Sequence, residues 1–148
     1  MDLPAEFELR SPSSEADFEK YYRLRFETLR KPWNQPPGSE RDAGDQDAVH
    51  ALILHSEKAV AVGRLHMNST EQAQIRYMGV DEKYRNKGLG AAVISFLETK
   101  AKELGAKTMM LESRDNAVPF YRKQGYVIDK KSYVLFDTIQ HYTMIKKV

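Results

Sequence analysis

The chain has 148 residues and a mass of 17.0 kDa, which fits one domain over residues 1–148 rather than two separate cores. Its net charge of +2, with acidic and basic residues interleaved, does not favour nucleic-acid binding, and the lack of cysteine excludes disulfides and a thiol nucleophile. No apolar run reaches the roughly eighteen residues of a membrane span, and the first residues lack the apolar core of a signal peptide, so we expect a soluble cytoplasmic protein that does not contact membranes.

The first predicted elements are a short strand over residues 7–10 and an amphipathic helix that follows a serine N-cap and an acidic first turn. The apolar stripe of this helix is expected to face the core and contains Phe18, Tyr22, Phe26 and Leu29. Three arginines lie off that stripe, and a solvated charged face is the simpler interpretation. The alternative is that Arg25 or Arg30 faces a cleft and binds an anionic group of a ligand.

The segment from Lys31 to Asp47 contains three prolines and two glycines, which rule out a continuous helix or strand. A loop of this length inside a compact domain is usually functional or disordered. It holds the only tryptophan of the chain, Trp33, and a disordered linker rarely needs one. We therefore expect an ordered loop that forms a wall of a substrate site, with Trp33 as a substrate-binding candidate, rather than a mobile linker.

The rest of the chain alternates strands and helices. The predicted strands cover residues 48–55, 59–67, 72–80, 107–113, 133–136 and 141–147. Two further helices are expected, a long one that ends at Gly105 and a short one over residues 116–123. This order predicts an α/β (α+β) fold with a mixed central sheet of about six or seven strands and helices on both faces.

The loop before the long helix has the sequence Arg85-Asn86-Lys87-Gly88-Leu89-Gly90. It brings two glycines and two cations to a helix N-terminus, where unpaired N–H groups and about half a positive charge attract anions. Glycine lets a phosphate lie against bare backbone. Capping or close packing is the commoner explanation for a lone Gly-x-Gly, so the prediction of an anion cradle depends on the neighbouring cations as well.

A second motif, Ala117-x-x-Phe120-Tyr121-x-x-x-Gly125-Tyr126, follows the fourth long strand. Together the two motifs resemble those of the acetyl-CoA-dependent N-acetyltransferases related to the histone acetyltransferase Gcn5, the GNAT superfamily. That family carries (Arg/Gln)-x-x-Gly-x-(Gly/Ala) at a helix start and then Ala-x-x-(Leu/Phe)-Tyr. The resemblance is close from Gln74 to Val127 and extends elsewhere to the order of the elements. It implies a single-domain GNAT fold.

The resemblance also implies that acetyl-CoA is the cofactor. The strand end Met78-Gly79-Val80 would hydrogen-bond the pantetheine arm as an added strand does. The pyrophosphate would bind the backbone amides of Arg85, Asn86, Lys87, Gly88, Leu89, Gly90 and Ala91. Gly79 is expected to interrupt side-chain packing so that the central strands splay, and a β-bulge at Gly79 that binds nothing is the alternative.

Transfer of an acyl group to an amine needs a base, because an ammonium with a pKa of about 10.4 is almost fully protonated at pH 7. Some members of the family use a Glu where this chain has Gln74, and an amide cannot accept the proton. The remaining candidates are His50, His141 and Glu112. His50 and the His141-x-x-Met144 spacing are similar to the ElaA-like branch of the family. A surface or capping role is the alternative for each histidine.

Tyr121 matches the family tyrosine that donates a proton to the departing sulfur, and packing is its alternative role. Many members have Asn three positions before Ala117, where this chain has Arg114. Asn116 is displaced by two positions, so the corresponding hydrogen bond to the cofactor lacks its usual donor. No metal site is predicted.

These features predict an N-acetyltransferase that moves an acetyl group directly to a primary amine in a ternary complex, since no cysteine can carry an acyl intermediate. A non-catalytic acyl-CoA sensor or interaction module on the same fold is the alternative, supported by Gln74. The expected partner is a small-molecule or peptide amine, selected by the Lys31 to Asp47 loop and the last hairpin. Self-association as a homodimer through the last strands stays open, because no residue pattern predicts it.

Overall fold

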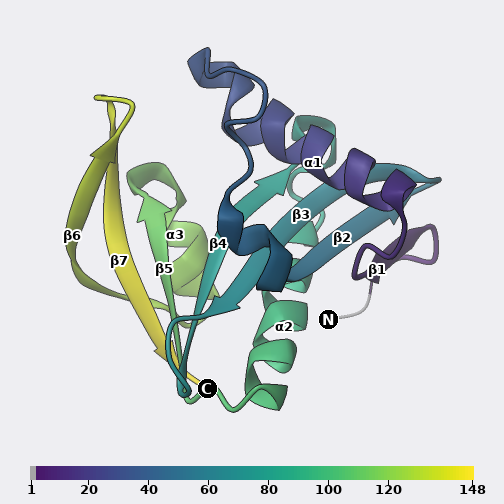
Figure 1. Ribbon diagram of the computed structural model, residues 1–148. Helices are drawn as coiled ribbons and strands as arrows, with labels where there is room; N and C mark the ends of the chain where they lie inside the picture. The colour runs from purple at the N-terminus through teal and green to yellow at the C-terminus, as the bar shows by residue number, and fades with distance from the viewer. Residues whose placement is uncertain (1–2) are drawn as a thin grey trace.

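The computed structural model describes residues 3–148, which form a seven-stranded mixed sheet with three α-helices (Figure 1). The strand order is β1-β2-β3-β4-β5-β7-β6, and β4 and β5 are the parallel neighbours. This arrangement confirms the predicted α/β fold. The strands are β1 (Phe7–Arg10), β2 (Val49–His55), β3 (Lys58–Met67), β4 (Gln72–Val80), β5 (Thr108–Arg114), β6 (Val127–Leu135) and β7 (Ile139–Lys147), and the helices are α1 (Glu15–Leu29), α2 (Leu89–Glu103) and α3 (Val118–Lys123).

Helix α1 covers one face of the sheet, over β3 and β4 (Figure 1). It begins at Ser14, whose hydroxyl accepts a hydrogen bond from the Asp17 amide at 3.1 Å. The side of α1 that is buried carries Tyr21, Leu24 and Arg25, so the predicted stripe was wrong in part. The helix is rotated relative to the prediction. Arg25 takes a buried position because the 31–47 segment supplies hydrogen-bond partners for its charge. Phe18 and Tyr22 pack only at the edge of this smaller core, and Phe26 is half-buried.

Helix α2 covers the opposite face and packs on β2, β3 and β4. Its N-cap is Gly88, which has a left-handed φ of 80°, and the chain leaves its C-terminal end through Gly105 at a φ of +97°. The larger of the two apolar cores lies under α2. It includes Val93, Ile94 and Leu97 of the helix and extends to Tyr121 on α3.

Strands β4 and β5 are bonded to each other over only half their length. Their register runs from Gln72↔Thr108 to Ile75↔Leu111 and then stops, while β7 stays paired with β5 up to Arg114↔His141. The two halves of the sheet therefore diverge, as Figure 1 shows. This splayed sheet was predicted, but the predicted cause was misplaced, since the strands separate before Gly79.

The irregularity in β4 lies two residues before Gly79. The register between β3 and β4 shifts between Val62 and Arg64, and Tyr77 has a φ of 57°. Gly79 itself pairs with Val62. A Cβ on Gly79 would collide with the hydroxyl of Thr28, so this glycine is needed for the close packing of α1 on β4.

Residues 31–47 form an irregular segment, as expected, and contain two 3-10 helices, η1 (Lys31–Trp33) and η2 (Ala43–Asp47). The last hairpin differs from its prediction. Strand β6 begins six residues earlier than the predicted 133, because its first half is exposed on both sides and has no apolar alternation to signal it. It pairs with β7 through two register shifts.

Candidate active site

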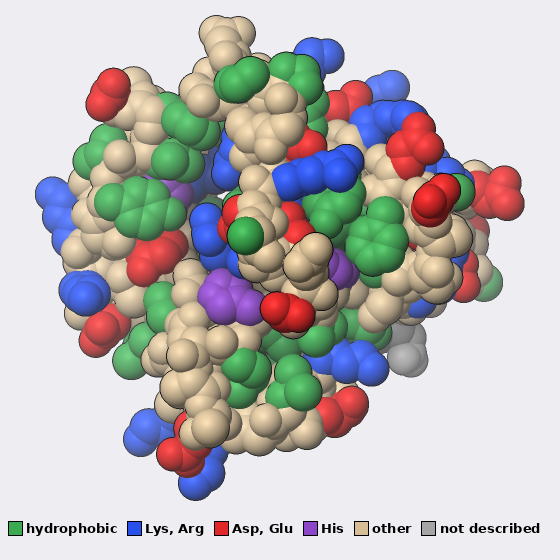
Figure 2. Space-filling model, viewed as in Figure 1, with side chains coloured by type: hydrophobic (Ala, Val, Ile, Leu, Met, Phe, Trp, Pro, Cys, Tyr) green, Lys and Arg blue, Asp and Glu red, His purple; other side chains and the backbone are tan. Residues whose placement is uncertain are grey.

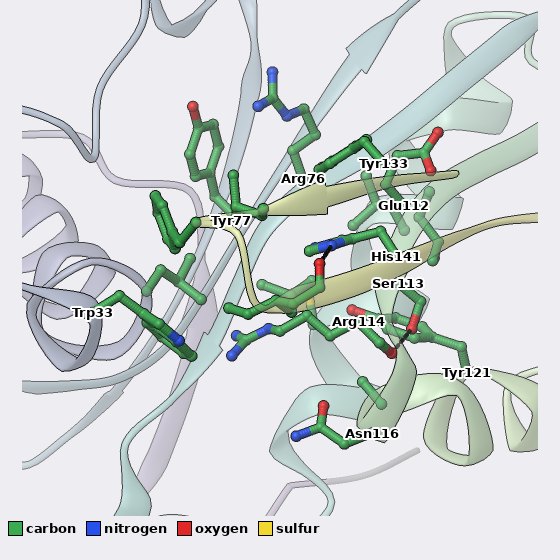
Figure 3. A pocket seen from close by; sticks show the side chains of 18 of the residues that line it. Trp33, Arg76, Tyr77, Glu112, Ser113, Arg114, Asn116, Tyr121, Tyr133 and His141 are labelled. Carbon is green, nitrogen blue, oxygen red and sulfur yellow. Dashed lines mark hydrogen bonds between the residues drawn. The ribbon is translucent and has the colours of Figure 1, made fainter. Parts of the chain in front are cut away.

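A cavity of about 410 Å³ opens where β4 and β5 separate (Figure 3). Its walls come from the end of α1 and η1, from β4, from β5 and the segment after it, and from the β6–β7 hairpin. The lining includes Leu29, Arg30, Trp33, Arg76, Tyr77, Met78, Arg85, Glu112, Arg114, Asn116, Tyr121, Tyr133, Phe136 and His141. The predicted site residues Trp33, Met78, Arg85, Tyr121 and His141 are thus brought together from segments far apart in the chain.

His141 lines the cavity, and among residues 3–148 only one of its two ring nitrogens is hydrogen-bonded. Its Nδ1 lies 3.0 Å from the carbonyl oxygen of Ile139, and its ring stacks on Tyr133 with centroids 4.6 Å apart. A carbonyl only accepts, so Nδ1 carries the proton of the neutral ring and the lone pair is on Nε2. Burial lowers the pKa of His141, and the charge of Arg114 acts in the same direction. The neutral form, able to accept a proton, is therefore favoured at pH 7.

Tyr121 lies on α3 and is 9% exposed, with its ring packed edge-on against Phe120 and Tyr126. Burial raises the pKa of its phenol to about 12, against the opposing effect of Arg114. The hydroxyl therefore stays protonated at neutral pH and can donate. The side chain lines the cavity while its ring belongs to the core, so it serves packing as well.

His50 is not brought to this cavity. Its Nδ1 is 2.7 Å from the Tyr21 hydroxyl and its Nε2 is 2.9 Å from the Asp45 carbonyl oxygen. Both ring nitrogens are thus engaged by the protein under α1, and burial lowers the pKa of this histidine. The geometry fits the capping alternative, and we propose no catalytic role for His50.

Arg25 is fully buried, which contradicts the solvated face expected for it, and it does not line the cavity either. Its Nη1 donates to the carbonyl of Glu40 at 3.0 Å and to Asp45 Oδ1 at 2.9 Å, and its Nη2 donates to the Tyr21 hydroxyl at 2.7 Å. A buried cation persists only with such partners. Arg25 thus holds the 31–47 loop and is not available to a substrate.

A second buried arginine completes this ionic cluster. Arg64 on β3 donates to Asp42 Oδ1 at 2.6 Å and to Asp45 Oδ1 at 3.0 Å. The hydroxyl of Tyr77, at the bulge of β4, donates to Asp42 Oδ2 at 3.0 Å. The loop that carries Trp33 is therefore anchored to α1, β3 and β4. An arginine inside the apolar strand 58–67 was the sequence signal for this cluster.

The backbone amides at the start of α2 are unoccupied by the protein. Within residues 3–148, the N–H groups from Asn86 to Ala91 donate no hydrogen bond to a protein acceptor, and no side chain caps the helix at Gly88. Arg85 leads from this loop into the cavity lining. Close packing also favours glycine at position 90, since a Cβ there would lie 3.0 Å from the Phe120 ring. The loop can accept an anion on its free amides.

Charged residues at the cavity were only partly predicted. Arg114 extends from β5 and holds its guanidinium 4.9 Å from the centre of the Trp33 ring (Figure 3). Both carboxylate oxygens of Glu112 lie 2.9 Å from the Thr143 hydroxyl. Arg76 and the hairpin aromatics Tyr133 and Phe136 carried no motif signal, because their place at the cavity depends on strand register.

Comparison with known proteins identifies the family. Residues 18–126 match the family model described as the acetyltransferase (GNAT) family. The chain belongs to this family. The match confirms the predicted superfamily, the predicted enzyme class, an acyltransferase, and the predicted use of acetyl-CoA.

Relatives of this GNAT protein agree in fold and in length. It is 29% identical over 133 residues to the uncharacterized N-acetyltransferase YjcF of Bacillus subtilis, covering 90% of this chain and 94% of the relative. A putative N-acetyltransferase from Lactobacillus plantarum superposes with a TM-score of 0.83 at 20% identity, over 95% of this chain and 97% of the other. Escherichia coli ElaA superposes with a TM-score of 0.79 at 22% identity, over 95% and 98%. Along the described 3–148 segment, no helix has the length and apolarity needed to cross a bilayer.

Proposed function

We propose that this GNAT protein transfers the acetyl group of acetyl-CoA directly to a primary amine in a ternary complex, with His141 as the base and Tyr121 as the acid. One observation carries the proposal: both side chains line the cavity that opens between β4 and β5. Each has the protonation state that its role requires at pH 7, because burial keeps His141 neutral and Tyr121 protonated.

The cofactor fits two features of the backbone. The edge of β4 from Arg76 to Val80 has no strand beside it on the β5 side, which leaves room for the pantetheine amides next to Met78, Gly79 and Val80. The free amides from Asn86 to Ala91, with Arg85, suit the pyrophosphate. When bound, acetyl-CoA supplies the thioester carbonyl carbon to which the amine adds.

His141 would act on the attacking amine. The Nε2 lone pair takes a proton from the nitrogen as the new C–N bond forms, and the hydrogen bond from Nδ1 to the Ile139 carbonyl holds the ring in the required tautomer. The imidazolium then releases this proton to solvent through the open cavity.

Tyr121 would act on the leaving side. Its hydroxyl donates to the sulfur as the C–S bond breaks, so that free thiol leaves and the phenol recovers its proton from solvent. An acceptor that arrives as an ammonium gives up two protons, one to become the nucleophilic amine and one as the amide forms. One proton reaches the sulfur, so the products are an amide, a thiol and one proton released to solvent.

The sensor alternative loses part of its support. It rested on Gln74 in place of a glutamate, but Gln74 pairs with His66 and Met110 where the sheet is still continuous. It does not line the cavity. A base supplied by His141 makes a carboxylate at that position unnecessary.

Calorimetric titration with acetyl-CoA, followed by thiol release with a panel of amines, tests the proposal. Binding in the micromolar range and amine-dependent thiol release are expected. Binding without release for any amine would support the sensor, and no binding at tens of micromolar would contradict both functions.

A further inference from the structure

The cavity is lined by far more positive than negative charge. Four guanidinium groups reach it, from Arg30, Arg76, Arg85 and Arg114, against the single carboxylate of Glu112. Figure 2 shows basic side chains and a histidine in the recess between the β6–β7 hairpin and the centre of the molecule. A polycationic acceptor would meet like charge here.

Two of these arginines already have partners among residues 3–148. Arg30 donates to the carbonyls of Ser39 and Leu29, each at 3.0 Å. Arg76 lies 3.4 Å from Asp42. Arg85 borders the free amides at the start of α2, where the phosphates of the cofactor are proposed to bind.

Arg114 and Arg85 have neither a carboxylate within 4.0 Å nor a hydrogen-bond acceptor among residues 3–148, but Arg85 is exposed whereas Arg114 is half-buried. The guanidinium carbon of Arg114 lies 4.9 Å from the centre of the Trp33 ring. The two more deeply buried arginines, Arg25 and Arg64, each bind an aspartate. A half-buried guanidinium whose donors face a cavity is suited to a planar anion that arrives with a ligand.

The position of Arg114 relates this anion to the reacting amine. Arg114 and His141 are direct partners in the β5–β7 ladder, so their side chains leave the same face about 5 Å apart at Cβ. An anion bound by Arg114 would share this face of the sheet with the base. One small molecule with an anionic group a few bonds from its amine would reach both residues.

We infer that the acceptor is a primary amine carrying a carboxylate or phosphate within a few bonds of its nitrogen, and that Arg114 binds this anionic group. The inference rests on the proposed acetyl transfer and narrows its acceptor class. Trp33 holds the guanidinium plane in place from the 31–47 loop.

Acetylation rates of short amines of matched size test this inference on the unmodified protein. The panel is ethylamine, 1,2-diaminoethane, glycine, β-alanine, 4-aminobutyrate and 2-aminoethyl phosphate. We expect kcat/KM for the best anionic amine to exceed that of ethylamine and the diamine by about tenfold or more, as for other charge-assisted contacts. The ranking of the carboxylates and the phosphate identifies the anionic group.

Arg114→Gln supplies the second arm, with Arg122→Gln on the exposed side of α3 as the matched control. The variant should raise KM for the anionic amine about tenfold relative to ethylamine and leave the KM of acetyl-CoA unchanged. Because the charge of Arg114 also lowers the pKa of His141, an effect on the base changes the rates of both amines together and cancels in this ratio. Arg122→Gln should change none of these. Should Arg114→Gln fail to fold, Arg114→Lys keeps the charge and is expected to lose part of the preference.

The outcomes that contradict the inference differ from those that contradict the proposed function. Equal rates for ethylamine and every anionic amine, or a change confined to the KM of acetyl-CoA in Arg114→Gln, would overturn the inference and leave acetyl transfer standing. Absence of acetyl-CoA binding would overturn the proposed function, and this inference with it.

Discussion

The hydroxyl of Tyr77 donates a 3.0 Å hydrogen bond to Asp42, which joins the bulge of β4 to the loop that precedes β2. The ring of Tyr77 lies 4.1 Å from the guanidinium carbon of Arg25, so the bulge rests on the buried ionic cluster. One side of the cavity, formed in part by Tyr77, is therefore held by Arg25 and Asp42, which do not line it. Changes in this cluster should affect stability before chemistry.

Substitution of Asp45 tests the cluster most directly, because its carboxylate forms ion pairs with both Arg25 and Arg64 and its side chain is 7% exposed. Asp45→Asn should lower the free energy of unfolding by about 3 kcal/mol or more, since two buried cations lose their shared counter-charge. Urea unfolding measures this. Asp47→Asn, on the exposed end of η2, is the control and should stay within about 0.5 kcal/mol. Equal effects of the two changes would contradict the role given to the cluster.

The profile of kcat against pH should have an acidic limb that reports the titration of His141. Burial lowers the pKa of this histidine below 6.5, so the active neutral form is present at pH 7 and is lost as the pH falls through the lowered pKa. We expect kcat to rise with pH along this limb, with a midpoint below 6.5, and then to level. His141→Gln should lower kcat about a hundredfold or more and remove the limb.

His50→Gln provides the contrast to this change. It removes a buried hydrogen-bonded histidine outside the cavity, so the melting temperature should fall while the acidic limb persists. If His50→Gln abolished the limb and His141→Gln did not, the assignment of the base would be reversed.

Tyr121→Phe should lower kcat about a hundredfold and leave the acetyl-CoA Kd nearly unchanged, because the proposed proton donor to the leaving sulfur is lost while the ring is retained. Tyr126→Phe is the matched control. It removes a 2.9 Å hydrogen bond to Glu98 in the core, which should cost about 1 kcal/mol of stability but not turnover. An unaltered rate in Tyr121→Phe would remove this residue from the mechanism.

Alanine substitutions of the two glycines at the start of α2 should have different effects on affinity and turnover. Gly88→Ala forces a Cβ into a left-handed conformation at a φ of 80° beside the free amides, so acetyl-CoA affinity should fall most. Gly90→Ala places a Cβ 3.0 Å from the Phe120 ring, which must give way by a few tenths of an ångström. Because this ring packs against Tyr121, kcat should fall more than affinity. Calorimetry and steady-state kinetics on both variants separate the effects. The reverse pattern would mean that Gly90, not Gly88, borders the phosphates.

The residues that could be predicted from sequence act through local backbone. Gly88 at a helix start and Tyr121 in a short helix after a strand belong to contiguous motifs, whose conformation depends on neighbours in the chain. The fold class, the family and the cofactor could therefore be recognised before any coordinates.

The roles of isolated ionisable side chains could not be predicted from the sequence. His50 and His141 have the same chemistry, and only the strand register puts one beneath α1 and the other at the cavity. Arg25 and Arg114 are likewise equivalent in sequence, yet acids brought by the 31–47 loop neutralise Arg25 and leave Arg114 facing open space. The partners of a charge come from elements distant in the chain, so its pKa, its burial and its availability to a substrate are decided by tertiary packing.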